Sequence, residues 1–208
     1  MAYSNVGIAN MALQRIGARS SITTFNDGSP NAIRVNAVWE YIRDEVIEAI
    51  KPKFATVRVA LAQSAVSPAN TDVWDYAYPL PSDYLCLADD NKDDNAVWPD
   101  DVAPYVIETL SDGTLCLMTN YDSTTADYQI YLTYIRKVAD PAKYTPSFIN
   151  AFVFRLGAEL SFSVPESGGK FEAMMTLYER AKKRAMGFSR AQDYLEDENG
   201  STSWENAR

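Results

Sequence analysis

The sequence predicts an α+β fold: a helical bundle built from N- and C-terminal helices, with an antiparallel β-domain inserted between them. Three observations predict it. Apolar residues recur at helical spacing up to residue 51, alternate with polar residues between 76 and 135, and return to helical spacing after residue 140. We therefore assign residues 1–70 and 140–195 to the helical bundle, 71–139 to the β-domain and 196–208 to a flexible C-terminal tail.

The longest predicted helix runs from Pro30 to Lys51, and both of its ends are marked in the sequence. Ser29 can accept a hydrogen bond from the first turn, and Pro30 suits the first helical position, where no N–H is needed. Pro52 prevents continuation past Lys51. At about 1.5 Å per residue the helix is roughly 33 Å long, which suits a scaffold for the other elements. Its predicted inward residues are Val35, Val38, Trp39, Ile42, Val46, Ala49 and Ile50, and its predicted outward residues are Glu40, Arg43, Asp44 and Glu48.

Shorter elements flank this helix. Residues 5–16 form a predicted helix that ends at Gly17, because glycine readily adopts the left-handed conformation that stops a helix. Residues 20–27 form a short extended piece that ends in a turn. Residues 54–61 are apolar enough to predict one or two further helical turns packed on the scaffold helix.

The middle of the chain predicts an antiparallel sheet. Residues 76–81 cannot be helical, because Pro79 and Pro81 each push the preceding residue into extended geometry. Alternating apolar residues and flanking turn signals predict the other strands. We interpret the many tyrosines here as cross-strand packing rather than as a sugar-binding platform. The other predicted strands are 84–88, 105–110, 114–119 and 128–135.

Two helices are predicted after the sheet. Thr145 and Pro146 begin a helix that is apolar on most of its circumference, so we expect it to be deeply buried. Residues 165–169 end it, and a last helix is expected over residues 171–195. Its predicted inward residues are Met174, Met175, Leu177, Tyr178, Ala181 and Ala185.

The composition excludes several classes of function. The 208 residues carry a net charge of −9, which argues against non-specific binding to the phosphate backbone of nucleic acids. Histidine is absent, which removes every Ser-His or Cys-His nucleophile pair and every histidine metal site. The chain has neither a signal-peptide pattern nor an apolar run of about 18 residues, so we expect synthesis in the cytoplasm and no membrane partner. Cys86 and Cys116 are predicted to be buried and reduced.

Two acidic clusters contain side chains of the types used in metal binding or hydrolysis. The loop 89–95 loosely follows the ligand spacing of a helix-loop-helix calcium site, but Asp94 replaces the required glycine, so we interpret it as a solvated loop and expect no metal or cofactor. Asp72, Asp75 and Asp83 lie among aromatic residues and could form the carboxylate pair of a polysaccharide hydrolase. Capping of turns is the more ordinary role for Asp75 and Asp83, and the hydrolase stays open as an alternative.

The last helix carries a basic cluster in an otherwise acidic chain. Arg180, Lys182, Lys183, Arg184 and Arg190 flank its apolar stripe and could simply form a solvated face. Together with the acidic loop and the acidic tail, they make the molecule bipolar. Bipolar subunits suit head-to-tail contacts in a ring, because unlike surfaces meet at every such interface.

Three stretches, taken together, carry a resemblance to a known family. They are Arg43-Asp44-Glu45-Val46-Ile47 with Lys51-Pro52-Lys53-Phe54-Ala55, then Tyr76-Ala77-Tyr78-Pro79-Leu80-Pro81-Ser82-Asp83-Tyr84-Leu85, then Asp140-Pro141 with Tyr144, Pro146-Ser147-Phe148 and Arg155-Leu156-Gly157-Ala158-Glu159-Leu160. In order and spacing the chain resembles the tail tubular protein A family, the head-to-tail adaptor (connector) proteins of short-tailed bacteriophages. Members commonly have an arginine after the leucine of the proline segment, where this chain has Cys86.

The resemblance implies a structural virion protein of the phage neck, not an enzyme. It implies a ring of twelve subunits that joins the portal protein to a tail nozzle resembling tail tubular protein B and lines the channel for ejected DNA. An acidic wall fits such a channel, because it repels phosphates and lets DNA pass without specific binding. A different ring of the same particle, such as a tail completion protein, is a further alternative.

The candidate contact residues follow from the bipolar surface and the resemblance. We expect the last helix and the tail to bind the portal, and the acidic loop to contact the nozzle or a neighbouring subunit. The portal-binding candidates are Arg180, Lys183, Arg184, Arg190, Tyr194 and Trp204, and the nozzle or subunit-interface candidates are Asp89, Asp90, Asp93, Asp94 and Trp98.

Overall fold

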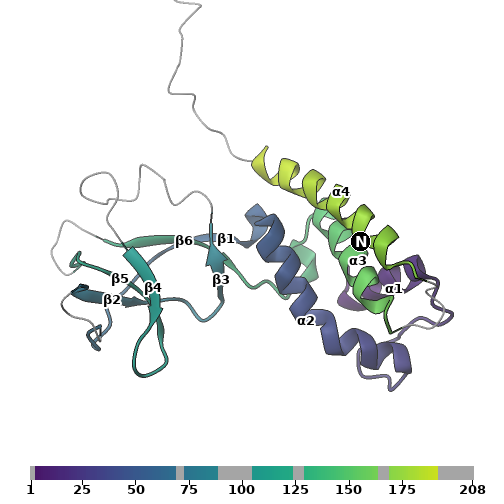
Figure 1. Ribbon diagram of the computed structural model, residues 1–208, viewed down its shortest axis with the longest axis horizontal. Coiled ribbons are helices and arrows are strands. Elements are labelled where there is room, and N and C mark those ends of the chain that lie inside the picture. Colours follow the sequence, from purple (N-terminus) through teal and green to yellow (C-terminus); the bar gives the residue numbers. More distant parts are fainter. Residues whose placement is uncertain (1–2, 69–72, 89–104, 124–128, 164–168, 192–208) are drawn as a thin grey trace, which may run out of the picture.

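The computed structural model of the chain describes residues 3–68, 73–88, 105–123, 129–163 and 169–191, which are drawn in colour in Figure 1. Within these ranges it contains four α-helices and two small antiparallel sheets of three strands each. The predicted α+β class is therefore confirmed. The helices gather at one end of the molecule and the sheets at the other (Figure 1).

The first two helices begin and end at the predicted signals. Helix α1, Asn5–Ile16, ends at Gly17, whose φ of 81° is left-handed. Helix α2, Pro30–Ile50, begins at Ser29, whose hydroxyl accepts a hydrogen bond from the N–H of Ala32 at 3.2 Å. It ends at Lys51, which adopts a left-handed conformation just before Pro52. Local sequence signals thus specify both helices.

The predicted inward face of α2 is mostly correct. Val35, Trp39, Ile42, Val46 and Ile50 are buried, whereas Ala49 is exposed. The outward assignment of Arg43 was wrong: its side chain is 8% exposed and its Nε lies 2.8 Å from the carboxylate of Asp44. A long side chain can cross the edge of the buried stripe when a neighbouring carboxylate pairs its charge.

Helix α3, Pro146–Leu160, is the centre of the bundle. Thr145 caps it by accepting a hydrogen bond from the N–H of Phe148, and two thirds of its residues are buried, as predicted. Phe148 and Phe152 are fully buried, and the Phe152 ring lies 4.8 Å from that of Trp39 on α2. Helix α4, Phe171–Arg190, packs along α3 with Met174, Tyr178, Ala181 and Ala185 buried. The expected continuation of this helix to Leu195 lies largely outside the described residues.

The expectation of further helical turns over residues 54–61 was wrong. A short 3-10 turn, Lys53–Ala55, leads directly into strand β1, Thr56–Ala60. Strand β1 pairs antiparallel with residues 131–135, far away in sequence. The β-branched residues Thr56, Val57 and Val59 favour a strand, and the partner strand satisfies the backbone groups that a helix would have satisfied locally.

The predicted single sheet is in fact two. One sheet has the order β1-β6-β3 and the other β2-β5-β4, and all neighbouring strands are antiparallel. The predicted strands occur with ends shifted by a few residues. Their bounds are β2 Tyr76–Pro79, β3 Tyr84–Leu87, β4 Tyr105–Thr109, β5 Leu115–Thr119 and β6 Tyr131–Arg136.

Apolar residues connect the two sheets to each other and the first sheet to the bundle. Tyr78 and Leu117 of the second sheet share a cluster with Leu132 and Tyr134 of the first. Ile135 of β6 belongs instead to the helical core. Because successive side chains of a strand point to opposite faces, β6 lies between the bundle and the second sheet. Cross-strand packing of tyrosines is confirmed for Tyr84 and Tyr134, whose rings stack at 5.9 Å.

Candidate functional site

The outer face of α4 carries a group of exposed cations. Arg180, Lys183, Arg184 and Arg190 are all exposed, whereas Lys182 turns toward the helix, 2.8 Å from Glu179 and 5.3 Å from the centre of the Tyr178 ring. The four exposed cations recur at intervals of one to six residues opposite the buried stripe of the helix. We call these four side chains the cationic face.

The cationic face is electrostatically unpaired within the described part of the chain. None of the carboxylates described there lies within ion-pair distance of Arg180, Lys183, Arg184 or Arg190. These charges stay in water in the isolated subunit, at little cost. In a chain of net charge −9 they form a local field of opposite sign, which can steer an acidic partner surface onto α4.

The structure holds α4 rigidly enough to present such a face. Ser189, buried in the last turn of α4, accepts a hydrogen bond from the N–H of Lys53 at 3.2 Å. Its hydroxyl donates to the carbonyl of Lys51 at 3.3 Å. At the other end of α4, Lys170 Nζ donates to the carbonyl of Ile16 at 2.9 Å, which ties the start of α4 to the end of α1. The cationic face is therefore a fixed platform.

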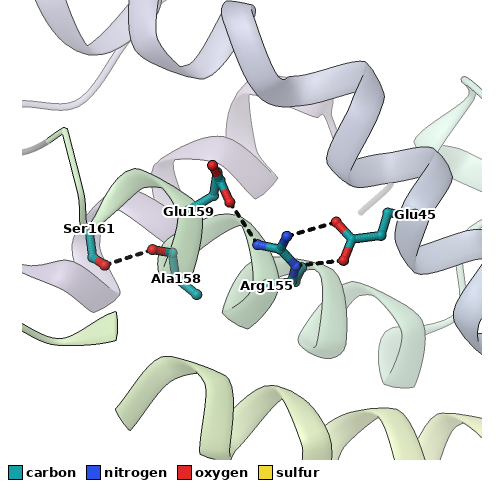
Figure 2. Close-up of polar contacts among 5 residues, drawn as sticks. All are labelled: Glu45, Arg155, Ala158, Glu159 and Ser161. Carbon is teal, nitrogen blue, oxygen red and sulfur yellow. Dashed lines mark hydrogen bonds and ion pairs between the residues drawn. The ribbon is translucent and has the colours of Figure 1, made fainter. Parts of the chain in front are cut away.

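A partly buried ion-pair network lies between α2 and α3 and was not foreseen from the sequence (Figure 2). Arg155 Nε donates to Glu45 Oε1 at 2.9 Å, Arg155 Nη2 lies 2.8 Å from Glu45 Oε2, and Arg155 Nη1 donates to Glu159 Oε2 at 3.0 Å. Burial lowers the pKa of Arg155, but the hydrogen bonds and charges of the two glutamates outweigh it and raise that pKa. The sequence signal for the network was the pair Arg155 and Glu159, two opposite charges four residues apart in the largely apolar helix α3.

This network supports the fold rather than a reaction. The fork of Arg155 clamps Glu45 with two contacts and joins helices that are 110 residues apart in sequence. Its residues fall in two of the stretches that carry the resemblance, 43–47 and 155–160. Those stretches therefore meet in space, and their charged residues fix how α2 and α3 pack.

The carboxylates considered for a hydrolase begin strands of different sheets. Asp75 precedes β2, and its backbone N–H donates to the side chain of Asn120. Asp83 precedes β3, and its Oδ1 accepts a hydrogen bond from the hydroxyl of Tyr134 at 2.7 Å. Burial, followed by this hydrogen bond and the charge of Asp83, raises the pKa of Tyr134 to about 12. Asp83 thus has a structural partner, and Asp72 lies outside the described residues.

Several predicted site residues lie outside the described ranges. They are Asp89, Asp90, Asp93, Asp94, Trp98, Tyr194 and Trp204. The thiol of Cys116 is buried, which raises its pKa, whereas Cys86 is partly exposed, and the two form no disulfide with each other. Among the described side chains, no group of three or more is arranged to hold a metal ion. None of the described helices is long and apolar enough to cross a membrane.

No protein-family model matches the chain, and no curated protein matches it.

Proposed function

We propose that the protein is a structural subunit of a head-to-tail adaptor ring in a short-tailed bacteriophage. In this proposal the ring joins the portal protein to the tail nozzle, and its wall lines the channel through which DNA leaves the capsid. The resemblance described for the sequence supplies the class of protein. The observation that carries the proposal is the unpaired cationic face of α4 on a chain that is otherwise acidic.

The surface of the molecule supports an assembly role. A soluble monomer gains little from concentrating cations on one helix, but a subunit that must dock in one orientation gains both attraction and selectivity. Charge repulsion rejects the wrong pairing of two acidic surfaces and favours the pairing of the cationic face with an acidic one. The net negative charge elsewhere suits a channel wall past which DNA slides without sticking.

The portal is the proposed partner of the C-terminal part of the chain. Candidates for this contact are the cations of α4 and, beyond them, Tyr194 and Trp204. Large aromatic side chains and arginines are the residues that most often contribute binding energy at protein interfaces. Because Ser189 anchors the end of α4 to the bundle, the residues that follow start from a fixed point.

The experiment is a mixing assay with a purified portal ring. The full chain and a variant lacking residues 196–208 are each added to the ring, and the mass of the complex is measured by light scattering. We expect the full chain to bind in multiple copies and the truncated chain to bind weakly or not at all. The last buried residue of α4 is Ser189, well before the truncation, so circular dichroism of the truncated chain should match that of the full chain.

A scrambled tail provides the matched control. It keeps the length and charge of residues 196–208 but changes their order, and we expect it to behave like the truncation if Trp204 makes a specific contact. Full binding by the truncated chain would assign the portal contact to another surface. A full chain that ignores the portal would contradict the adaptor proposal itself.

A further inference from the structure

Helix α2 has an outer face that none of the described elements covers. Ile33 is 63% exposed and Tyr41 is 66% exposed, and together with the exposed Ala37 they stand four residues apart along one ridge. Large apolar side chains exposed in a row on one helix are unusual for a surface that stays in water. This ridge therefore has the character of a contact surface.

An acidic ridge runs beside the apolar one. Glu40, Asp44 and Glu48 are also spaced by four residues, so they line up along the same side of α2. The Glu40 side chain is 83% exposed, and its nearest cation, Arg43, lies 4.0 Å away and pairs more closely with Asp44. Within the described residues Glu48 has no ion-pair partner. The outer face of α2 is thus both apolar and acidic.

The chain itself carries the complementary surface. On α4, Arg180, Arg184 and Phe188 are spaced by four residues, and all three are exposed. Phe188 is 49% exposed, so this ridge combines two cations with one apolar ring. Lys183 and Arg190 lie on the neighbouring ridge of the same helix.

The order of charges fixes how the two ridges would meet. Along α2 the apolar residues come first and the acids later, whereas along α4 the cations come first and Phe188 last. Phe188 and Arg180 are eight residues apart, about 12 Å along the helix. Only an antiparallel crossing brings Phe188 to Ala37 while Arg180 lies beside Asp44 and within one turn of Glu48. The same crossing sets Arg184 beside Tyr41, whose ring can accept a cation. Ridges with equal four-residue spacing interdigitate readily.

The position of the two helices in one subunit suits a chain of identical contacts. Helices α2 and α4 lie on either side of α3 (Figure 1), and their outer faces are exposed to solvent. They contain 21 and 20 residues, so at about 1.5 Å per residue their lengths match. Two different patches on one subunit produce a head-to-tail interface, which closes into a ring when the rotation allows.

We infer that the outer face of α2 in one copy binds the Arg180-Arg184-Phe188 ridge of α4 in the next copy. The occupant of the α2 face is therefore a second copy of this chain. The inference rests on the proposed function insofar as the closed assembly is the adaptor ring. Because this contact uses Arg180 and Arg184, the candidates that remain for binding the portal are Lys183, Arg190 and the residues beyond the end of α4.

The test uses charge reversal on each side of the contact. One variant carries Glu40→Arg and Glu48→Arg, and the other carries Arg180→Glu and Arg184→Glu. Self-association of the full chain is followed by sedimentation equilibrium at increasing protein concentration. Each variant alone should associate at least about tenfold more weakly than the wild type, because it replaces two attractive charge pairs with two repulsive ones.

Mixing the two variants is the decisive measurement. The reversed α2 of the first then meets the reversed α4 of the second, and both of their other faces remain complementary, so an equimolar mixture should regain wild-type association. A variant with Lys137→Glu and Lys143→Glu makes the same charge change on exposed lysines outside α4 and should associate like the wild type. Circular dichroism of every variant checks that the fold is retained.

Two results would overturn the inference: a wild type that stays monomeric throughout, or a mixture that associates no better than its components. Portal binding of the wild type is measured separately. Binding to the portal without restoration on mixing would leave the adaptor proposal in place and remove this interface. Restoration on mixing without portal binding would keep the interface and remove the adaptor.

Discussion

Replacing Arg155 by methionine tests how strongly the ion-pair network holds α2 against α3. The Arg155 side chain is 11% exposed and makes contacts of 2.8, 2.9 and 3.0 Å with two carboxylates. Methionine keeps the length and the apolar stem of arginine but removes the charge. Glu45 and Glu159 would then face each other across the helix interface with no cation between them (Figure 2).

The cost follows from how much water still reaches the glutamates. Removing one partner of a fully buried ion pair costs about 3 to 5 kcal/mol. The side chains of Glu45 and Glu159 keep 34% and 33% of their exposure, so solvent can recover part of that loss. We therefore expect Arg155→Met to lower the free energy of unfolding by about 2 kcal/mol, roughly half of the buried value. For a chain of this size the melting temperature should fall by about 4 to 8 °C.

Urea unfolding followed by tryptophan fluorescence and circular dichroism measures this change, because Trp39 is buried beside α3. A double-mutant cycle with Glu45→Gln isolates the coupling, and the double variant should be less destabilised than the sum of the two single variants. Arg184→Met is the matched control, since Arg184 is exposed on α4 and should change stability by less than about 0.5 kcal/mol. Additive single effects, or a loss for Arg155→Met no greater than that of the control, would refute the reasoning.

Two further predictions concern a buried phenol and a helix stop. Burial raises the pKa of Tyr144 to about 12, so its stabilising effect is complete below pH 10 and is lost as the pH rises toward 12. This one phenol should account for up to about 3 kcal/mol of the stability that the wild type loses in that window. Tyr144→Phe should lower the free energy of unfolding by about 1 kcal/mol near pH 7, because the Val138 carbonyl loses its hydrogen-bond donor. Between pH 10 and 12 the variant should lose less stability than the wild type. An equal alkaline loss in both proteins would contradict this. Gly17→Ala and Gly28→Ala both place a side chain at positive φ, but only at Gly17 would the new Cβ meet Lys170 Nζ, at 2.9 Å. Thermal unfolding should show Gly17→Ala as the less stable variant by about 1 kcal/mol, since that lysine caps α1. Equal losses would mean that the lysine contact contributes nothing.

Predictions that depended on local chemistry were confirmed. Ser29, Pro30 and Pro52 specified the start and stop of α2, because a cap or a missing N–H acts within one helical turn. Gly17 ended α1 for the same reason. The cations of α4 could also be placed on an outward face in advance, since their spacing put them opposite Tyr178 and Ala185.

Predictions that depended on distant partners were less successful. The segment after Lys53 is apolar in either conformation, and its pairing with β6 made it a strand. The division of the strands into two sheets likewise depends on which strands pair. The burial of Arg43 and the partial burial of Arg155 were not recognised, because the carboxylates and helices that surround them come together only in the fold.

The sequence by itself therefore determined the helices, their caps, the extended character of the middle of the chain and the cationic outer side of α4. These properties depend on residues within about one or two turns of each other. The tertiary structure decided the pairing of strands, the burial of Arg155 against Glu45, and the exposure of Ile33 and Tyr41 on the outer face of α2. Each of these depends on which elements pack together, and a periodic pattern along one element shows which face is apolar without showing whether anything covers it.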